Sequence, residues 1–294
     1  MSAAVASSVA PEAPEVLISL DSVDFVELRW VLEDKHRVSR ATAIELVEKF
    51  RRDGKLAAEY VTDAQALAQG MPVAYVIGWI DFLGCRIDLS LRPLIPRPET
   101  EFWVEQFIAA ERLRNLNRKK PLRVLDLCCG SGCVGIAVLS QLPNVHVTSV
   151  DIDPKMVEQT ELNLHGNHIP DDRYSLITSD LFSGVDGRFD VILTNPPYVD
   201  AFGDFSPSLS FEPPLSLFAQ NNGHAFIDQI FSKAKNHINS DGQMYIEFAA
   251  NQGNRVQEMA VLSGWNFRVF QDHFARDRFG ICTLISSKSP TYIG

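Results

Sequence analysis

The chain has 294 residues, of which 46% are hydrophobic and 22% charged, and its 27 Lys and Arg against 37 Asp and Glu leave a net charge of −10. This composition is typical of a folded globular protein and excludes a disordered or collagen-like chain. The acidic balance argues against a protein that holds nucleic acid mainly through phosphate contacts, since those need clustered Lys and Arg.

The cysteines and the N-terminus indicate the compartment. Five cysteines occur, and Cys128, Cys129 and Cys133 crowd into six positions, which is atypical of a disulfide framework. No second Cys or His cluster at ligand spacing follows that would predict a metal site. The first residues lack the basic and apolar regions of a secretory signal, and no apolar run approaches the ~20 residues of a membrane span. We therefore expect reduced thiols, no metal and no membrane contact in a cytoplasmic protein.

Four segments are expected along the chain. They are a flexible tail over residues 1–16, a small helical domain over 17–71, a β-hairpin linker over 72–98 and an α/β domain over 99–294. The tail is rich in Ala, Ser and Pro. The linker holds β-branched and aromatic residues punctuated by Gly78 and Gly84, which favours a hairpin over a helix. A helix then opens at Pro98, with acidic residues in its first turn.

Three helices are predicted in the helical domain. The first spans Asp21–Lys35 and the second Arg40–Arg52, with Ser39 as its N-cap and Gly54 at its end. A third lies near Asp63–Gln69.

Strands and helices alternate from Leu122 onward. Strands are predicted at 122–127, 145–151, 174–180, 189–195 and 242–249, helices at 133–142, 154–168, 224–238 and 252–263, and closing strands at 266–270 and 280–286. This alternation predicts a mostly parallel sheet with helices on both faces. The two closing strands have no helix between them, so we expect a hairpin at one edge of the sheet.

A glycine-rich loop follows the first predicted strand. Gly130 and Gly132 allow the backbone to turn tightly and approach a ligand, and the helix that follows offers unpaired N–H groups. Asp151 ends the next strand, where a carboxylate can accept both hydroxyls of a ribose. With Gly135 the loop also fits the G-x-G-x-x-G pattern of nicotinamide binders. The loop therefore predicts a nucleotide-like ligand without choosing one, and we expect its cysteines to serve packing.

The sequence Asn195-Pro196-Pro197-Tyr198 directly follows the strand residues 189–194. The prolines carry no N–H, so carbonyl oxygens are the exposed backbone groups. Together with the Asn195 side-chain oxygen they form a pair of acceptors beside an aromatic ring. Such a site suits a planar NH₂ group, whose lone pair is then aimed out of its plane at an electrophile. Aligning this delocalised nitrogen is the catalytic task, and a sulfonium methyl donor would complete an in-line displacement.

These motifs resemble those of the HemK/PrmC family of class I S-adenosylmethionine-dependent methyltransferases, which methylate the glutamine side-chain amide in peptide chain release factors. The matching stretches are PVAYVIGWIDFLG, LIPRPETE, DLCCGSGCVGIAV, VDIDP, SDLFSG, TNPPYVD, FEPPLSLF and RDRFG. The resemblance implies an α/β fold, a Rossmann-like seven-stranded class I methyltransferase sheet with a small N-terminal helical domain and a linking β-hairpin. It also implies S-adenosyl-L-methionine as cofactor and a release factor as protein substrate, with no direct nucleic-acid binding.

The resemblance assigns cofactor binding to ten residues. They are Asp126, Leu127, Cys128, Cys129, Gly130, Gly132, Asp151, Asp180, Leu181 and Asn195. Asp151 would hold the ribose, while Asp180 and Leu181 would flank the adenine. The family often has Gly at position 128 and an aromatic residue at position 181, so here the loop is expected slightly further from the cofactor and stacking on the adenine is weaker.

The resemblance assigns catalysis to Asn195, Pro196, Pro197, Tyr198 and Phe82. Asn195 would touch both the methyl region of the cofactor and the glutamine amide, with the Pro196 carbonyl as second acceptor. Tyr198 would wall the glutamine pocket, and Phe82 would reach toward the glutamine from the hairpin.

Three further residues have supporting roles by resemblance. Arg97 and Glu101 would order a lid over the cofactor, and Glu212 would hold the loop that follows the Asn-Pro-Pro-Tyr motif. Glu247 matches the family only loosely.

Several alternatives remain open from the residues. The motif can hold the exocyclic amine of an adenine in DNA or RNA, but that base must be flipped out of its stack, and no basic groove is evident. A glutamine in a ribosomal protein is another acceptor, although LIPRPETE resembles the release-factor enzymes more. A catalytically silent binding module and a dehydrogenase using the three glycines are the remaining alternatives.

Overall fold

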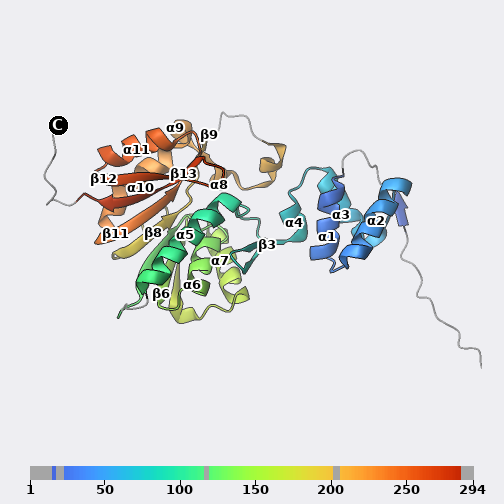
Figure 1. The fold of residues 1–294 in the computed structure, drawn as a ribbon, viewed down its shortest axis with the longest axis horizontal. Coiled ribbons are helices and arrows are strands. Elements are labelled where there is room, and N and C mark those ends of the chain that lie inside the picture. Colours follow the sequence, from blue (N-terminus) through green and yellow to red (C-terminus); the bar gives the residue numbers. More distant parts are fainter. Residues whose placement is uncertain (1–14, 18–22, 116–118, 201–205, 286–294) are drawn as a thin grey trace, which may run out of the picture. The chain divides into compact units, whose positions relative to one another are not determined.

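The computed structural model describes residues 15–17, 23–115, 119–200 and 206–285. The chain divides into two compact units with the boundary between Gly78 and Trp79 (Figure 1). The tail expected over residues 1–16 lies outside the described residues, except that its last two begin a short strand. No described helix combines the length and apolar character needed to cross a membrane.

The first unit is mainly helical. Its elements are β1 (Glu15–Leu17), α1 (Phe25–Asp34), α2 (Arg40–Asp53), β2 (Lys55–Ala57), α3 (Ala58–Ala68) and α4 (Val73–Ile77). The first two predicted helices are confirmed, and Ser39 Oγ accepts the Thr42 N–H at 3.2 Å as the N-cap of α2. Gly54 ends α2 at a φ of +66°, in the left-handed region that glycine adopts most readily. The third helix begins earlier than predicted, at Ala58.

The prediction of a hairpin from Pro72 onward is wrong for its first residues. They form α4, because Val76 is buried among the apolar side chains of α1, α2 and α3, with Val73 and Ile77 packed beside it. Local β-propensity is overridden by this packing. The helical unit consequently extends to Gly78, which ends α4 at a φ of +91°.

The second unit begins with the hairpin of β3 (Trp79–Phe82) and β4 (Cys85–Asp88). Its remaining elements are α5 (Pro98–Asn115), β5 (Leu122–Leu127), α6 (Cys133–Gln141), β6 (Val145–Asp151), α7 (Pro154–Gly166), η1 (Asp171–Arg173), β7 (Tyr174–Thr178), β8 (Phe189–Thr194), β9 (Val199–Asp200), η2 (Pro207–Phe211), α8 (Pro214–Leu217), β10 (Phe218–Ala219), α9 (Gln220–Gly223), α10 (Ala225–Lys233), η3 (Ala234–Asn236), β11 (Ile238–Glu247), α11 (Gly253–Leu262), β12 (Trp265–Gln271) and β13 (Asp277–Leu284).

The expected seven-stranded sheet is confirmed, with the strand order β12-β13-β11-β8-β5-β6-β7. All neighbouring strands are parallel except β13, which runs antiparallel to both β11 and β12. The closing hairpin therefore places β13 inside the sheet and β12 at its edge. A dinucleotide-binding sheet has the order 3-2-1-4-5-6 without such an insertion, so the topology separates this fold from that of a nicotinamide dehydrogenase.

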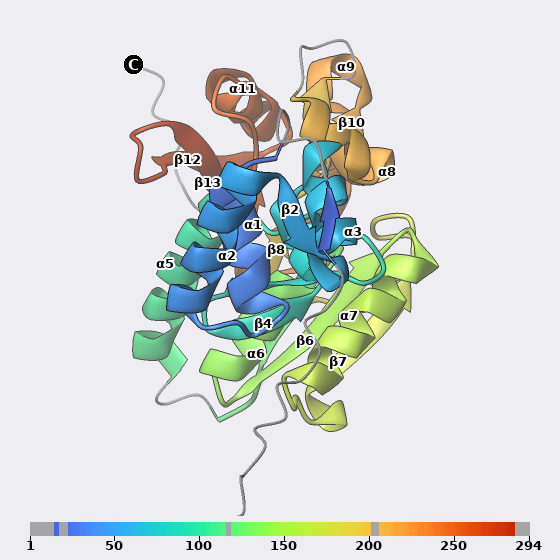
Figure 2. The same cartoon turned by 90° about the vertical axis from the view of Figure 1, so that its right-hand side faces the viewer.

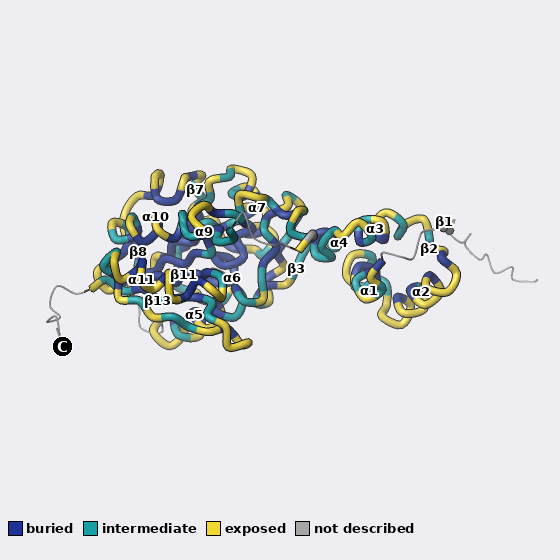
Figure 3. Tube along the Cα trace, turned by 90° about the horizontal axis from the view of Figure 1, so that it is seen from above, coloured by how far each residue is buried: buried dark blue, intermediate teal, exposed yellow. Residues whose placement is uncertain are grey.

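Helices cover both faces of the sheet. Helices α5, α6 and α7 pack against one another on one face, and α10 and α11 lie on the other (Figure 1). Figure 2 shows α5, α6 and α7 from a second direction. The central strands β5, β6 and β8 are largely buried (Figure 3). Side chains alternate between the faces, so Leu125 and Leu127 join the core with Ile230 and Phe231 of α10, while Asp126 points toward α6.

Polar side chains of α7 and of its C-cap residue, Asn167, bind the hairpin to the rest of the second unit. Asn163 Oδ1 accepts the N–H of Asp88 at 2.7 Å, and Asn167 Oδ1 accepts that of Arg86 at 3.1 Å. Gln159 Oε1 accepts the N–H of Leu91 at 2.8 Å. These bonds satisfy the edge of β4, so the hairpin belongs to the second, α/β unit rather than forming a separate linker that ends at Pro98.

Candidate active site

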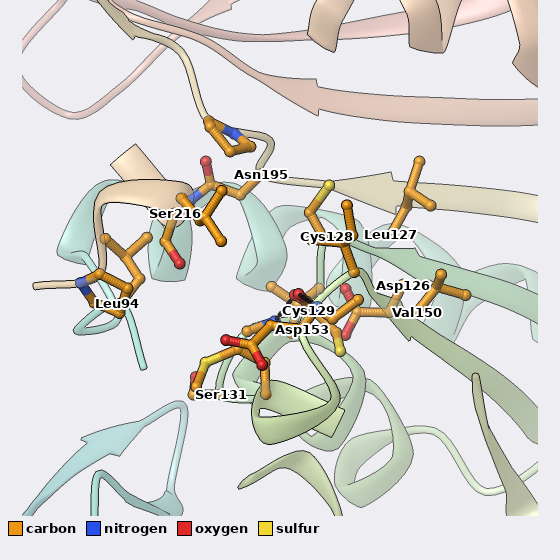
Figure 4. Close-up of a pocket in the computed structure, with 18 of the residues that line it drawn as sticks. Leu94, Asp126, Leu127, Cys128, Cys129, Ser131, Val150, Asp153, Asn195 and Ser216 are labelled. Atoms are coloured by element: carbon orange, nitrogen blue, oxygen red, sulfur yellow. Dashed lines mark hydrogen bonds between the residues drawn. The ribbon is translucent and has the colours of Figure 1, made fainter. Parts of the chain in front are cut away.

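A cavity opens at the carboxyl ends of β5, β6 and β8. This is the point where the strand order reverses, because β6 lies on one side of β5 and β8 on the other, and ligands of open α/β sheets bind at such points. Ten of the predicted site residues line it: Asp126, Leu127, Cys128, Cys129, Gly130, Asp151, Asp180, Leu181, Asn195 and Pro197. Figure 4 shows Leu94 and Ser216 on the side opposite to Leu127 and Val150.

The three glycines of the loop are needed for different reasons. Gly130 has a φ of +54° and nothing within 4 Å of a Cβ built on it, so its backbone faces open space in the cavity. Gly132 has a φ of +77°, and its Cβ would lie 2.6 Å from Thr160 Cγ2. The Cβ at Gly135 would lie 2.9 Å from Asp126 Oδ2. Of the three, Gly130 therefore serves the approach of a ligand, Gly132 allows the loop to approach α7, and Gly135 allows α6 to pack closely on β5 and β6.

We expect Gly132→Ala to lower the free energy of unfolding by about 2–4 kcal/mol, because it combines a left-handed backbone with overpacking against Thr160. Denaturant unfolding measures the loss. In the Thr160→Ala background the same substitution should cost less, because the side chain that it meets is gone. Gly166→Ala is the matched control, since its Cβ meets nothing within 4 Å. A loss equally large in both backgrounds would contradict the steric explanation.

Four carboxylates line the cavity. They belong to Asp126, Asp151, Asp153 and Asp180, and among the described lining residues the one basic side chain is Arg97. Asp151 Oδ2 accepts the N–H of Gly130 at 2.9 Å, and its Oδ1 accepts that of Asp153 at 3.0 Å. Asp151 therefore holds both loops that border the cavity. The negative potential of the lining carboxylates favours a cationic ligand.

Asp126 is the most deeply buried of these carboxylates. It is 2% exposed and accepts the N–H of Gly135 at 3.0 Å. Burial raises the pKa of this carboxyl to about 7, and the negative charge of Asp151 adds to the increase. Near neutral pH a positive ligand will therefore favour the ionised form.

The raised pKa of Asp126 predicts how stability depends on pH. The folded protein holds this proton up to about pH 7, whereas the unfolded chain releases it near the ordinary value of 3.8. The contribution of Asp126 to the free energy of unfolding should thus be complete below the unfolded value and decrease as the pH rises through about 7. Thermal unfolding of the wild type and Asp126→Asn from pH 5 to 8 measures it, because asparagine keeps the acceptor for Gly135. Parallel curves for the two proteins would refute this dependence.

The cysteines of the loop have little thiolate character. All five cysteines of the chain are free thiols, and Cys128, Cys129 and Cys133 line the cavity. Burial raises the pKa of Cys133 to about 12 and that of Cys128 even further. A thiol is nucleophilic only as thiolate, so these side chains contribute packing. Cys128 also has a φ of +62°, a conformation that costs a non-glycine residue roughly 1–2 kcal/mol.

Two segments on the far side of the cavity are joined through Glu212. This carboxylate is 4% exposed and accepts the N–H of Ile95 at 3.0 Å and an Arg97 guanidinium N–H at 2.6 Å. Leu94 and Leu215, one from each segment, line the cavity. Glu101 contacts a different element, because its Oε1 accepts the N–H of Leu83 in the hairpin turn at 2.7 Å.

The Asn-Pro-Pro-Tyr motif borders the cavity with only part of its length. Asn195 is half-buried, and its Nδ2 donates to Thr100 Oγ1 at 3.1 Å. Pro197 lines the cavity, while the Tyr198 hydroxyl donates to Glu247 Oε1 at 2.9 Å. The Tyr198 carbonyl accepts the side-chain amide of Gln252 at 3.1 Å. The motif is thus held at its tyrosine end and faces the cavity at its asparagine end.

Four predicted site residues do not line the cavity. Pro196 is buried beside it, and Gly132 packs against Thr160. Tyr198 packs against the core that lies under α10 and α11. Phe82 is 1% exposed, inside the hairpin. The catalytic roles of Pro196, Tyr198 and Phe82 stay predictions.

Sequence reasoning missed Thr100 and left Glu247 without a role. Thr100 is 2% exposed and lines the cavity, and Glu247 is fully buried. Glu247 accepts hydrogen bonds from Thr100, Trp103 and Tyr198. Burial raises the pKa of Glu247, and these three hydrogen bonds partly oppose that increase. Two features of the sequence could have indicated these residues. Thr100 is a polar residue inside the LIPRPETE motif, and Glu247 is an acidic residue at the end of a buried strand.

Known proteins resemble this chain over most of its length. Residues 110–206 match the family described as "Methyltransferase small domain". The release factor glutamine methyltransferase of Lactococcus lactis subsp. lactis is 30% identical over 267 residues, which is 89% of this chain and 95% of that protein. The enzyme of the same name from Chlamydia trachomatis serovar L2 is 33% identical over 211 residues, 71% of this chain and 70% of that protein.

A solved structure supports the fold. The structure titled delta-N METTL16 MTase domain matches 69% of this chain and 90% of its own, with a TM-score of 0.50 and 14% identity. At this identity the match shows a shared methyltransferase fold and nothing more. The sequence relatives decide the family: the chain belongs to the release factor glutamine methyltransferases.

Proposed function

We propose that this chain transfers a methyl group from S-adenosyl-L-methionine to the side-chain amide nitrogen of a glutamine in a protein, a peptide chain release factor. The observation that carries the proposal is that Asn195 and Pro197 border the same cavity as the glycine loop and Asp151. The names of the sequence relatives supply the substrate class.

The residues that line the cavity suit S-adenosylmethionine. Its four carboxylates suit a molecule with a positive sulfonium and ammonium group, and the open space at Gly130 allows close approach to the backbone. We assign the ribose hydroxyls to Asp151 and the flanks of the adenine to Asp180 and Leu181. When bound, the cofactor supplies an electrophilic methyl group on its sulfonium.

The residues of the chain would orient the acceptor. Asn195 Oδ1 and the Pro196 carbonyl accept the two N–H bonds of the glutamine amide and hold its plane, so that the nitrogen lone pair faces the methyl group. Leu94, Pro197 and Leu215 line the cavity with apolar surface. The amide nitrogen becomes strongly acidic once it is methylated, so its proton leaves without a strong base.

Phe82 and Tyr198 complete the proposed acceptor site. Tyr198 holds the end of the motif through its bonds to Glu247 and Gln252. Phe82 is fixed within the hairpin, whose turn is bound to Glu101. We assign both to the wall of the glutamine pocket.

The test uses the full-length chain with S-adenosylmethionine labelled in its methyl group. Release factors, a ribosomal protein and duplex DNA or RNA are offered separately, and mass spectrometry locates the label. We expect one methyl group on a glutamine side chain of a release factor, and none when that glutamine is replaced. Label found only in nucleic acid or in the ribosomal protein would overturn the proposal.

A further inference from the structure

A line of hydrogen bonds runs from the edge of the cavity into the protein. Asn195 Nδ2 donates to Thr100 Oγ1 at 3.1 Å, and Thr100 Oγ1 donates to Glu247 Oε2 at 2.7 Å. Thr100 is 2% exposed and Glu247 is fully buried, so water does not compete for the bond between them. The three residues come from the first turn of α5 and from the ends of β8 and β11, which are distant in sequence.

We infer that Thr100 and Glu247 are positioning residues, which hold the Asn195 carboxamide in the one orientation that turns its oxygen away from Thr100 and toward an acceptor amide. This inference rests on the proposed function, in which Asn195 accepts an N–H of the glutamine. A carboxamide has two orientations of nearly equal shape, and the other one would present an NH₂ group to the NH₂ group of the substrate.

Glu247 determines which groups donate and which accept along this line of hydrogen bonds. Its Oε2 accepts both Thr100 Oγ1 and Trp103 Nε1, each at 2.7 Å. An indole N–H can only donate, so this carboxylate oxygen is held as an acceptor. Thr100 Oγ1 therefore donates its single hydroxyl proton to Glu247. The lone pairs of Thr100 Oγ1 can then only accept a hydrogen bond. The partner that Asn195 turns toward Thr100 is therefore its NH₂ group.

The surroundings keep Glu247 in this arrangement. Trp103 is fully buried, and its ring is stacked on Tyr245 at 6.4 Å between centroids. The other carboxylate oxygen, Oε1, accepts the Tyr198 hydroxyl at 2.9 Å. Thr100 and Trp103 lie one helical turn apart on α5, so they reach the same carboxylate from one helix face. The orientation of Asn195 is thus determined by packed groups and not by the substrate.

Substitutions at position 100 test the role of the hydroxyl. We expect Thr100→Val to lower kcat for release-factor methylation roughly 10- to 100-fold, the range for a misplaced polar group in a desolvated site, with the cofactor Kd unchanged within about twofold. Thr100→Ser keeps the hydroxyl and should restore kcat to within about threefold of the wild type. Glu247→Gln can donate to Thr100, which permits the reverse orientation, so it should resemble Thr100→Val. Thr148→Val is the matched control, a buried threonine in β6, and should leave kcat unchanged.

A double-mutant cycle separates positioning from general damage. If Thr100 acts through Asn195, Thr100→Val should have no further effect on residual turnover in the Asn195→Ala background. An equal loss in both backgrounds, or an unchanged kcat for Thr100→Val alone, would overturn the inference.

A measurement without turnover distinguishes failure of this inference from failure of the proposed function. Hydrogen exchange of the Asn195 side-chain NH₂ group, followed by NMR, should be slow in the wild type and fast in Thr100→Val, because the bond to Thr100 protects it. Fast exchange in the wild type would refute the orientation, whatever the substrate. Slow exchange together with no methylation of any release factor would leave the orientation supported and refute the proposed function.

Discussion

Replacing Asn195 with alanine is expected to lower kcat for glutamine methylation roughly 100- to 1,000-fold, the effect of removing one preorganised polar group at a reacting centre. The hydrogen bond from the acceptor amide to Asn195 Oδ1 strengthens as the nitrogen gains positive charge, so the loss falls on the transition state more than on the bound substrate. Initial rates with labelled S-adenosylmethionine and a saturating release factor measure it. Calorimetry should find the cofactor Kd within about threefold of the wild type, because binding is shared among many groups lining the cavity.

Asn239→Ala is a matched control for that substitution. Asn239 Nδ2 donates to Asp190 Oδ1 at 2.8 Å near the beginning of β11, at the end of the sheet opposite to the cavity. It should leave kcat within about twofold, since it touches nothing in the proposed site. Wild-type turnover in Asn195→Ala on every acceptor would remove Asn195 from the mechanism.

Asp151→Ala is expected to weaken binding of S-adenosylmethionine roughly 10- to 100-fold, the equivalent of one or two hydrogen bonds to a charged group. The substitution removes the proposed acceptor of the ribose hydroxyls, and it also leaves the N–H groups of Gly130 and Asp153 without their carboxylate partner. The KM for the cofactor should rise accordingly. At saturating cofactor, kcat should stay within about threefold, because Asp151 lies away from the transferred methyl group in the proposed arrangement.

Asp151→Asn provides the graded comparison. The amide keeps one acceptor oxygen but replaces the other with a donor, so the cofactor Kd should lie between those of the wild type and Asp151→Ala. An unchanged Kd for Asp151→Ala would refute the ribose assignment. A large loss of kcat at saturating cofactor would instead place Asp151 near the chemistry.

Most of the sheet could be predicted from sequence because its signals are local. Buried strands such as Leu122–Leu127 are short apolar runs bounded by turn residues, and α7 (Pro154–Gly166) begins with a capping Asp153 followed by proline. Such patterns identify an element without knowledge of its neighbours. The prediction of strand fails at helix α4 because its Val, Tyr and Ile residues favour strands by local propensity, whereas packing within the helical unit stabilises a helix there.

The candidate site was predictable where its residues follow strand ends. Asp126, Asp151 and Asn195 end or follow parallel strands, and strands that run the same way bring their carboxyl ends to one edge. The role of Thr100 could not be predicted because its hydrogen-bond partner, Glu247, lies 147 residues away in the sequence. Nothing in a local pattern distinguishes a buried threonine in a charged helical turn from an exposed one.

By itself, the sequence determined the alternation of strands and helices, the glycine loop and the Asn-Pro-Pro-Tyr motif that borders the cavity. These depend on backbone preferences and on the period of apolar residues, which a short segment carries alone. The tertiary structure decided that β13 inserts between β11 and β12, that the hairpin belongs to the second unit, and that Glu247 meets Thr100 and Tyr198. Burial forces polar groups from distant segments to find one another, because an unpaired group inside the protein costs more than a hydrogen bond contributes.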